Sequence, residues 1–191
     1  MKIGVLALQG AFIEHIRVLK SLGVDAIEVR KPGQLSDLDG LIIPGGESTT
    51  FGKLATTFGL MEPMRAFCSS GKPVWGTCAG MILLAKDVGS DQPRIGAMDV
   101  QVERNAFGRQ VDSFEADLDI PVLTPAAPFH CVFIRAPLIA SAGNGVEVLA
   151  RLPDGRIVAA RQNNVLATAF HPELTTDNRF HRFFIGAEKS S

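Results

Sequence analysis

The first half of the chain alternates short apolar runs with segments in which apolar residues recur at helical spacing. Ile3–Leu8 is continuously apolar, as expected of a strand that is buried on both faces. In the next segment the apolar residues return at every third or fourth position, at Phe12, Ile16, Leu19 and Leu22. The pattern therefore predicts a β-strand followed by an amphipathic helix that ends near Gly23.

The same alternation continues as far as residue 86. We expect strands at Val24–Val29, Leu41–Ile43 and Val74–Trp75, and helices at Thr50–Phe58, Glu62–Ser70 and from residue 79 to Lys86. Strands that alternate with helices favour a parallel sheet covered on both faces. We therefore predict an α/β fold, a flavodoxin-like three-layer sandwich with a mainly parallel central sheet.

The second half is richer in strands. Val100 and Val102 alternate with polar residues, and Cys131–Ile134 is apolar. A meander is predicted from the strands Val146–Leu152, Arg156–Gln162 and Val165–Phe170, with a strong hairpin signal at Asp154-Gly155 and a weaker one at Asn163-Asn164. The last two expectations are an exposed loop at Pro121–Pro128 and a final helix from Asn178 to about Ala187.

Composition narrows the class of protein. With 191 residues, 46% of them hydrophobic, the chain can bury one core, and we expect a single domain over residues 1–191. The net charge of -1, with acidic and basic residues interspersed, gives no sign of nucleic-acid or membrane binding. Three cysteines without framework spacing favour a reducing compartment, which suggests the cytoplasm. No apolar run approaches the roughly 18 residues that span a bilayer.

The strongest chemical signal is Cys78 within Gly76-Thr77-Cys78-Ala79-Gly80. It follows a predicted strand and precedes a predicted helix, which is the setting of a nucleophile elbow. Gly76 and Gly80 would let the strand and helix approach closely, and the helix N-terminus would favour the thiolate that attacks carbon. Cys68 and Cys131 lack such flanking glycines, so we expect both to be structural.

A cysteine that cleaves amides needs an acid-base partner, because the departing amine must receive a proton. His171 closes the strand Val165–Phe170, and Glu173 is two residues further on, on the same face of an extended chain. Glu173 could therefore orient the imidazole of His171. The remaining histidines, His15, His130 and His181, are expected to be surface or packing residues.

The oxyanion formed during attack needs backbone donors. Candidates are the N–H of Ala79, at the start of the helix, and an N–H of the loop Gly45-Gly46, with that of Gly46 preferred. The loop lacks the lysine of a P-loop, which argues against nucleotide binding. The cysteines have no paired C-x-x-C spacing, so we expect neither a metal site nor a cofactor on this chain.

Five segments together resemble the triad-type class I glutamine amidotransferases, and among them the glutaminases of pyridoxal 5'-phosphate synthase. They are Leu8–Ala11, Pro44–Thr50, Gly76–Gly80, Glu103–Gln110 and Phe170–Thr175. The Gly76–Gly80 pattern fits the whole superfamily, whereas Pro44–Thr50 and Glu103–Gln110 are narrower. The similarity extends over essentially the whole chain.

The resemblance implies that the protein hydrolyses L-glutamine to L-glutamate and ammonia, and that the ammonia passes to a separate, oligomeric, barrel-shaped synthase subunit. Cys78, His171 and Glu173 would form the catalytic triad. The implied substrate-binding residues are Gly46, Glu47, Ser48, Arg104, Ile134 and Arg135. Glutamine carries an α-carboxylate and an α-ammonium, which an arginine and the Glu47 carboxylate could face.

The resemblance also implies that the glutaminase is weak until it docks on the synthase, with Gly45-Gly46 as the element that changes conformation. Two alternatives remain open at this stage. The first is a glutaminase that serves another synthase, such as one of histidine biosynthesis. The second is a flavodoxin-like redox or regulatory protein whose cysteine senses oxidants without turnover, and such a protein would not require His171 and Glu173.

Overall fold

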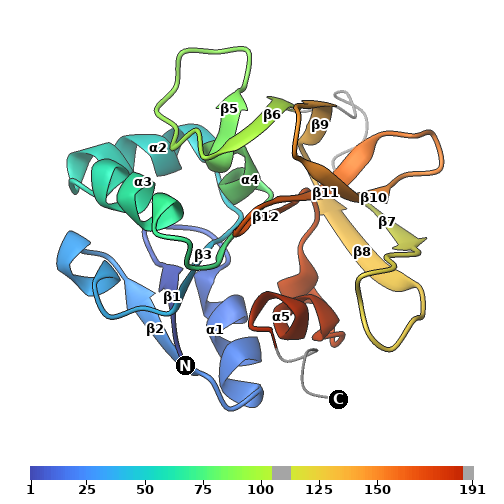
Figure 1. The fold of residues 1–191 in the computed structure, drawn as a ribbon, viewed down its shortest axis with the longest axis horizontal. Helices are drawn as coiled ribbons and strands as arrows, with labels where there is room; N and C mark the ends of the chain where they lie inside the picture. The colour runs from blue at the N-terminus through green and yellow to red at the C-terminus, as the bar shows by residue number, and fades with distance from the viewer. Residues whose placement is uncertain (105–112, 187–191) are drawn as a thin grey trace.

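The computed structural model describes residues 1–104 and 113–186 and has an α/β architecture built on a large mixed sheet (Figure 1). Within these residues, ten strands form that sheet: β1 (Lys2–Leu6), β2 (Asp25–Val29), β3 (Gly40–Ile43), β4 (Val74–Thr77), β5 (Ala85–Asp87), β6 (Met98–Glu103), β9 (Leu138–Ala142), β10 (Glu147–Arg151), β11 (Ile157–Gln162) and β12 (Val165–Thr168). A separate hairpin pairs β7 (Ser113–Leu118) with β8 (Phe129–Ile134).

The sheet has a parallel half and an antiparallel half. Its strand order is β2-β1-β3-β4-β12-β11-β9-β6-β5, with β10 paired to β11. The pairs from β2 to β12 are parallel, and so is the pair of β5 and β6. The pairs that involve β9, β10 and β11 are antiparallel. The predicted α/β fold is confirmed, and the strands β1 to β4 from the half whose sequence alternates strand and helix pair only in parallel, joined by β12 from the second half.

Helices cover both faces of the parallel half (Figure 1). They are α1 (Phe12–Ser21), α2 (Ser48–Thr57), α3 (Met61–Ser69), α4 (Ala79–Leu84) and α5 (Arg179–Phe184), and the short 3-10 turns are η1 (Pro32–Leu35) and η2 (Pro172–Leu174). Successive residues of β4 show which helix lies on which face. Trp75 packs against Phe180 of α5, whereas Gly76 lies against Gly80 of α4.

Aromatic side chains fill the core beside β4. The rings of Trp75, Phe129, Phe170, Phe180 and Phe184 contact one another in stacked, tilted or edge-on pairs. These residues come from β4, β8, the segment after β12, and α5. Their contacts therefore tie the C-terminal helix and the β7-β8 hairpin to the central sheet.

Several predicted boundaries are wrong for identifiable reasons. The helix expected to reach Lys86 ends at Leu84, because Ala85 turns to an extended conformation and pairs with Met98 of β6. The final helix spans Arg179–Phe184 and ends before Gly186, whose φ is 70°. Ala187 itself lies outside the described residues.

The meander is confirmed: β10 and β11 are antiparallel across Asp154-Gly155, and β11 and β12 across Asn163-Asn164. The loop at residues 121–128 is also present, and the Arg179 guanidinium donates to the carbonyls of Pro125 and Ala127 within it. Strands β5, β7 and β9 were not predicted. Among the described residues, none of the helices has the length and apolar character needed to span a membrane.

Candidate active site

The candidate nucleophile Cys78 stands at a sharp turn between β4 and α4. Its backbone has φ 49° and ψ −105°, a left-handed conformation that costs energy for a residue with a side chain. The Cys78 N–H donates to the Thr168 carbonyl of β12 at 2.8 Å, which fixes the turn against the sheet. The predicted nucleophile elbow is therefore present in the structure.

The glycines on either side of Cys78 are required by close packing. A Cβ atom on Gly80 would lie 1.9 Å from the Ile43 carbonyl oxygen, and one on Gly76 would lie 2.5 Å from the Gly80 carbonyl carbon. Both of these neighbours are backbone atoms, which cannot move aside cheaply. Helix α4 can pack this closely on β3 and β4 only because neither position carries a side chain.

His171 and Glu173 meet as predicted, but through a different local structure. The strand β12 ends at Thr168, and residues Pro172–Leu174 form the 3-10 turn η2 rather than extended chain. The turn brings the Glu173 Oε1 within 2.7 Å of the His171 Nδ1. The backbone N–H of His171 donates to the Val132 carbonyl of β8 at 2.9 Å. This hydrogen bond holds the backbone of His171 against β8.

Electrostatics favour a protonated His171. Burial opposes the charge, but the hydrogen bonds and the electrostatic attraction of Cys78 and Glu173 together outweigh burial and raise the pKa of His171 to about 10. Because Nδ1 is occupied by Glu173, Nε2 is the nitrogen left for Cys78. Burial also acts to raise the pKa of the Glu173 carboxyl, but His15 and His171 together lower that pKa below its ordinary value. The cluster thus places a protonated imidazole beside the Cys78 sulfur.

The glycine loop lies directly against this pair. A Cβ atom on Gly45 would lie 2.3 Å from the His171 Cε1 and 3.3 Å from the Cys78 Cβ. The Gly45 carbonyl oxygen accepts a hydrogen bond from the Ala11 N–H at 3.1 Å, and a Cβ atom on Gly10 would lie 1.8 Å from that oxygen. The loops that follow β1, β3 and β4 therefore meet at one edge of the sheet, as expected of a parallel α/β fold.

The loops after β3 and β4 border a cavity of about 310 Å³. Its lining residues are Gly46, Glu47, Ser48, Cys78, Ala79, Ile82, Arg104, Ile134, Arg135, Pro137 and His171. All the predicted site residues line it except Glu173, which lies buried behind the imidazole. Sequence reasoning missed Ile82 and Pro137, which are apolar and carry no chemical signal of their own.

The charged lining residues are partly occupied by contacts within the protein. Glu47 caps α2: its carboxylate accepts the Thr50 hydroxyl at 2.6 Å and the N–H groups of Thr49 and Thr50. These bonds, that of the Thr50 hydroxyl foremost, lower the pKa of Glu47 to about 2, so it is a carboxylate at neutral pH. The Arg104 guanidinium donates to Gln92 Oε1 at 3.0 Å, which aligns it at the cavity.

Two arginines and one carboxylate thus surround the cavity. Arg135 has a positive φ of 43°, a strained conformation at the cavity wall. Its neighbour Ile134 is 38% exposed, and the Cys78 Sγ lies 4.0 Å from the Ile134 carbonyl oxygen. This charge pattern matches a small ligand that carries one negative and one positive group. The Glu103–Gln110 motif lies beyond residue 104 for the most part, outside the described residues.

The histidines expected to be surface or packing residues differ in placement. His130 lies exposed within β8, between Asp117 and Glu115, whereas His15 and His181 are fully buried. His15 Nε2 lies 3.4 Å from the Glu173 Oε2. A signal for its burial does exist in the sequence, because His15 falls on the same helical face as the apolar residues of α1.

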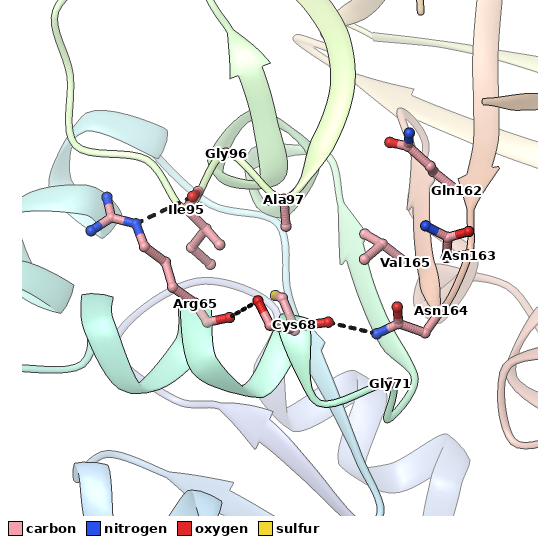
Figure 2. Close-up of a pocket in the computed structure, with 11 residues that line it drawn as sticks. Arg65, Cys68, Gly71, Ile95, Gly96, Ala97, Gln162, Asn163, Asn164 and Val165 are labelled. Atoms are coloured by element: carbon pink, nitrogen blue, oxygen red, sulfur yellow. Dashed lines mark hydrogen bonds between the residues drawn. The ribbon is translucent and has the colours of Figure 1, made fainter. Parts of the chain in front are cut away.

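A second, larger hollow of about 430 Å³ lies between α3, the segment 95–97 and the β11-β12 turn (Figure 2). Two of its polar side chains are engaged within the protein: the Asn164 amide donates to the Cys68 and Lys72 carbonyls, and the Arg65 Nε donates to the Ile95 carbonyl. None of the predicted site residues lies in it. In the part of the chain that the structure describes, no group of three or more His, Cys, Asp or Glu side chains is arranged to hold a metal ion.

Comparison with known proteins agrees with this geometry. The chain is 61% identical over 190 residues to pyridoxal 5'-phosphate synthase subunit PdxT of Herpetosiphon aurantiacus, with 97% of this chain and 100% of that protein covered. It is 63% identical over 186 residues to the PdxT subunit of Pelotomaculum thermopropionicum, with 97% and 94% covered. A crystal structure of a glutamine amidotransferase superposes with a TM-score of 0.91 at 54% identity, covering 96% of this chain and 97% of the other.

The elbow cysteine, the histidine paired with a buried carboxylate, and the glycine loop beside them occur in a chain whose residues 5–189 match one family model throughout. That model describes the SNO glutamine amidotransferase family. The extent of the match leaves only short segments at either end outside it. The chain belongs to the SNO glutamine amidotransferase family.

Proposed function

We propose that this protein hydrolyses L-glutamine to L-glutamate and ammonia, and supplies the ammonia to the synthase subunit of a pyridoxal 5'-phosphate synthase. The observation that carries the proposal is the alignment of Cys78, His171 and Glu173 at a cavity of about 310 Å³. Identity of 61% and 63% to PdxT subunits supports this synthase rather than another as the partner.

In the first half-reaction the Cys78 thiolate attacks the side-chain amide carbon of glutamine. The amide oxygen becomes an oxyanion, and we assign the N–H groups of Gly46 and Ala79 as its donors. Ala79 is the first residue of α4, so its N–H has no acceptor within the helix. The His171 imidazolium then gives its proton to the departing nitrogen, the C–N bond breaks, and ammonia leaves a glutamyl thioester on Cys78.

In the second half-reaction the neutral His171 takes a proton from water, and the resulting hydroxide attacks the thioester carbon. Collapse of this intermediate breaks the C–S bond, releases glutamate and restores the thiolate beside the imidazolium. Glu173 holds the Nδ1 side of the imidazole at 2.7 Å throughout, so Nε2 keeps facing the reacting atoms.

The proposed substrate contacts follow from charge. Arg104 and Arg135 are the cations at the cavity, so we assign the α-carboxylate of glutamine to them. Glu47 supplies the negative charge for the α-ammonium, and Ser48 and Gly46 line the path of the side chain. Ile134 contributes an apolar wall next to the carbonyl that faces Cys78.

Docking of the synthase is proposed to activate the site by changing the Gly45-Gly46 loop. The Gly45 carbonyl is held by the Ala11 N–H at 3.1 Å, and this hydrogen bond must break before the Gly45-Gly46 peptide can rotate. Two glycines permit both orientations at little steric cost. A partner that binds one orientation better would then shift the population towards it.

The setting we propose is the cytoplasm, with the chain acting as one glutaminase domain. The three cysteines, Cys68, Cys78 and Cys131, are all free and buried, which suits a reducing compartment. Burial raises the pKa of Cys68 to about 12 and raises that of Cys131 further still, so neither competes with Cys78 as a nucleophile.

The test measures glutamate release from glutamine by the chain alone and with a pyridoxal 5'-phosphate synthase subunit, with Cys78→Ala as the blank. We expect weak release by the chain alone and a large, Cys78-dependent increase on mixing. Full activity of the isolated chain would overturn the activation by docking. No release in either case would overturn the glutaminase assignment for this partner and favour a regulatory cysteine.

A further inference from the structure

The carboxylate of Glu173 has two oxygens, and only one of them serves His171. Oε1 lies 2.7 Å from the His171 Nδ1. Oε2 points into the interior and, within the described residues, is buried without a hydrogen bond of good geometry. The nitrogen that faces it is Nε2 of His15 at 3.4 Å, and both of these side chains are fully buried.

His15 is itself the middle of a buried chain of polar groups. Its Nδ1 lies 3.0 Å from Nε2 of His181, and its Nε2 lies 3.3 Å from the Thr77 hydroxyl. Helix α1 supplies His15, α5 supplies His181 and β4 supplies Thr77, which is the residue before the nucleophile. This series of hydrogen-bonding groups therefore leads from the candidate triad into the core along one face of the sheet.

The tautomer of His15 determines whether the buried Oε2 of Glu173 has a donor. The contacts with Thr77 and His181, by contrast, can form in either tautomer. If Nδ1 carried the proton, the Nε2 lone pair would face the Glu173 carboxylate, and two acceptors would oppose each other in the core. If Nε2 carries the proton, it can donate towards Oε2, while Nδ1 accepts from the Nε2–H of His181. Only the second arrangement gives the buried carboxylate oxygen a donor.

Both buried histidines are neutral in this arrangement. Burial lowers the pKa of His15, and the nearby Glu173 offsets this only in part, with His171 lowering it further and Glu14 raising it. Burial lowers the pKa of His181 well below its ordinary value, and His15 adds to that effect. The contact with Glu173 is thus a neutral N–H facing a carboxylate rather than an ion pair.

We propose that His15 is a positioning residue of this active site, which donates from Nε2 to the second oxygen of Glu173, and that His181 fixes the tautomer that makes this possible. The inference rests on the proposed function, since it extends the role assigned there to Glu173. Held at both oxygens, the carboxylate keeps Oε1 directed at His171 and stays ionised.

The simpler interpretation is that both histidines only fill the core. Both rings do pack edge-on against Trp75, at centroid distances of 5.5 Å for His15 and 5.0 Å for His181. The two interpretations differ in what the nitrogen atoms do. Packing alone predicts no particular tautomer and no effect on the titration of Cys78, so both can be measured.

The first measurement reads the tautomers directly in the intact chain by ¹⁵N chemical shifts of the histidine rings. The expected result is a proton on Nε2 and none on Nδ1 for His15, and a proton on Nε2 of His181. A proton on Nδ1 of His15 with a bare Nε2 would overturn the proposal. This measurement needs no substitution, so it cannot fail through misfolding.

The second measurement follows Cys78 alkylation by iodoacetamide against pH in the isolated chain with His15→Leu, which removes the donor. An unpaired buried carboxylate favours states in which Glu173 is protonated, and these do not support the imidazolium. The pH midpoint for thiolate reactivity is therefore expected to rise by about one unit. His15→Gln, whose amide can donate from the same place, should restore the midpoint.

A matched control separates packing from positioning. Leu19→Ala removes a buried side chain from the same helix, so it should lower the melting temperature without moving the midpoint. If His15→Leu does not fold, His181→Leu replaces it, and a smaller rise in the same direction is expected. An unchanged midpoint in every histidine variant that folds, or the same rise in Leu19→Ala, would overturn the proposal.

The last measurement is the rate of glutamine hydrolysis in the complex with the synthase. His15→Leu should lower kcat roughly tenfold with little change in KM, because His15 does not touch the substrate cavity. The alkylation profile does not depend on glutamine or on the synthase. If the wild-type chain shows the expected pH dependence of Cys78 alkylation but releases no glutamate, the proposed function is overturned. The alkylation of the histidine variants then still decides the positioning role of His15.

Discussion

Cys78 and Cys68 each line a cavity of the same molecule, and their surroundings differ in the properties that govern the chemistry of a thiol. Cys78 stands on a strained turn next to the His171 imidazole, whose pKa is raised to about 10. Cys68 lies near the end of α3 in the larger hollow, where burial raises its pKa to about 12 (Figure 2). Cavity size therefore does not mark the site in this protein.

The difference lies in how the polar groups of the two cavities are used. In the hollow around Cys68 the Asn164 amide and the Arg65 guanidinium are taken up by backbone carbonyls. The cavity around Cys78 is instead lined by two arginines, the Glu47 carboxylate and the His171 imidazole, which are groups that a small charged ligand can bind. Charged and acid-base groups that converge on a thiol, rather than the size of the hollow, mark the candidate site.

The strongest test of the difference between the two cavities is the substitution His171→Ala. This substitution should lower the rate of glutamate release in the complex about 10⁴-fold or more. No imidazolium then stabilises the Cys78 thiolate, and no group then donates a proton to the departing ammonia. His130→Ala, in an exposed histidine of β8, is the matched control and should keep its rate. A His171→Ala enzyme within tenfold of wild type would remove the basis for distinguishing the two cavities.

The two thiols can be compared directly by alkylation at pH 8, followed by mass spectrometry of the peptides. With a pKa of about 12, Cys68 has roughly 10⁴ thiols for each thiolate at that pH. We expect a single adduct, at Cys78, until the chain is unfolded. Raising the pH should bring Cys68 into reaction only as its pKa is approached. Equal labelling of both cysteines in the folded chain would contradict the comparison.

The elbow is expected to be the part of the Cys78 cavity that tolerates substitution least. In Gly80→Ala the new Cβ would meet the Ile43 carbonyl oxygen of β3 at 1.9 Å, so β3 and α4 must separate. We expect about 3 kcal/mol or more of lost stability together with loss of activity. Gly33→Ala, which meets nothing within 4 Å, is the control and should be neutral in urea unfolding. An unchanged Gly80→Ala protein would mean that the close packing is not required.

The smallest expected effect is in the hollow. Asn164→Ala leaves the Cys68 and Lys72 carbonyls without their donor, which should lower the free energy of unfolding by about 1–3 kcal/mol. The kcat and KM for glutamine in the complex should not change, because no atom of the hollow faces the substrate. Urea unfolding and glutamate release measure the two properties separately. A tenfold change in kcat would show that the hollow contributes to function.

Much of the site could be predicted because its signals are local. Gly76, Cys78 and Gly80 fall within five residues, and the contact between Gly76 and Gly80 is decided by the turn itself, although Gly80 also packs against Ile43 of β3. His171 and Glu173 were also predicted as a pair, although the extended chain assumed for them is the 3-10 turn η2. The contact was right because two residues across a short turn can still approach each other.

Other parts of the molecule could not be predicted in this way. Residue 85 continues an apolar run, yet it begins β5 because β6 offers a strand to pair with. The strand β7, which pairs with the predicted strand β8, and the strand β9 were missed, since their stability depends on partners elsewhere in the chain. The proposed role of Glu47 in binding must now also accommodate its observed role as the cap of α2.

By itself the sequence determined the order of strands and helices in the first half, the elbow around Cys78, and the pairing of His171 with Glu173. Each of these depends on side chains only a few positions apart, so hydrophobic period and glycine spacing report them. Only the tertiary structure decided that His15 and His181, 166 positions apart, meet in the core behind Glu173. Hydrophobic spacing shows that a helical face is buried, but the group it meets there depends on how distant segments pack.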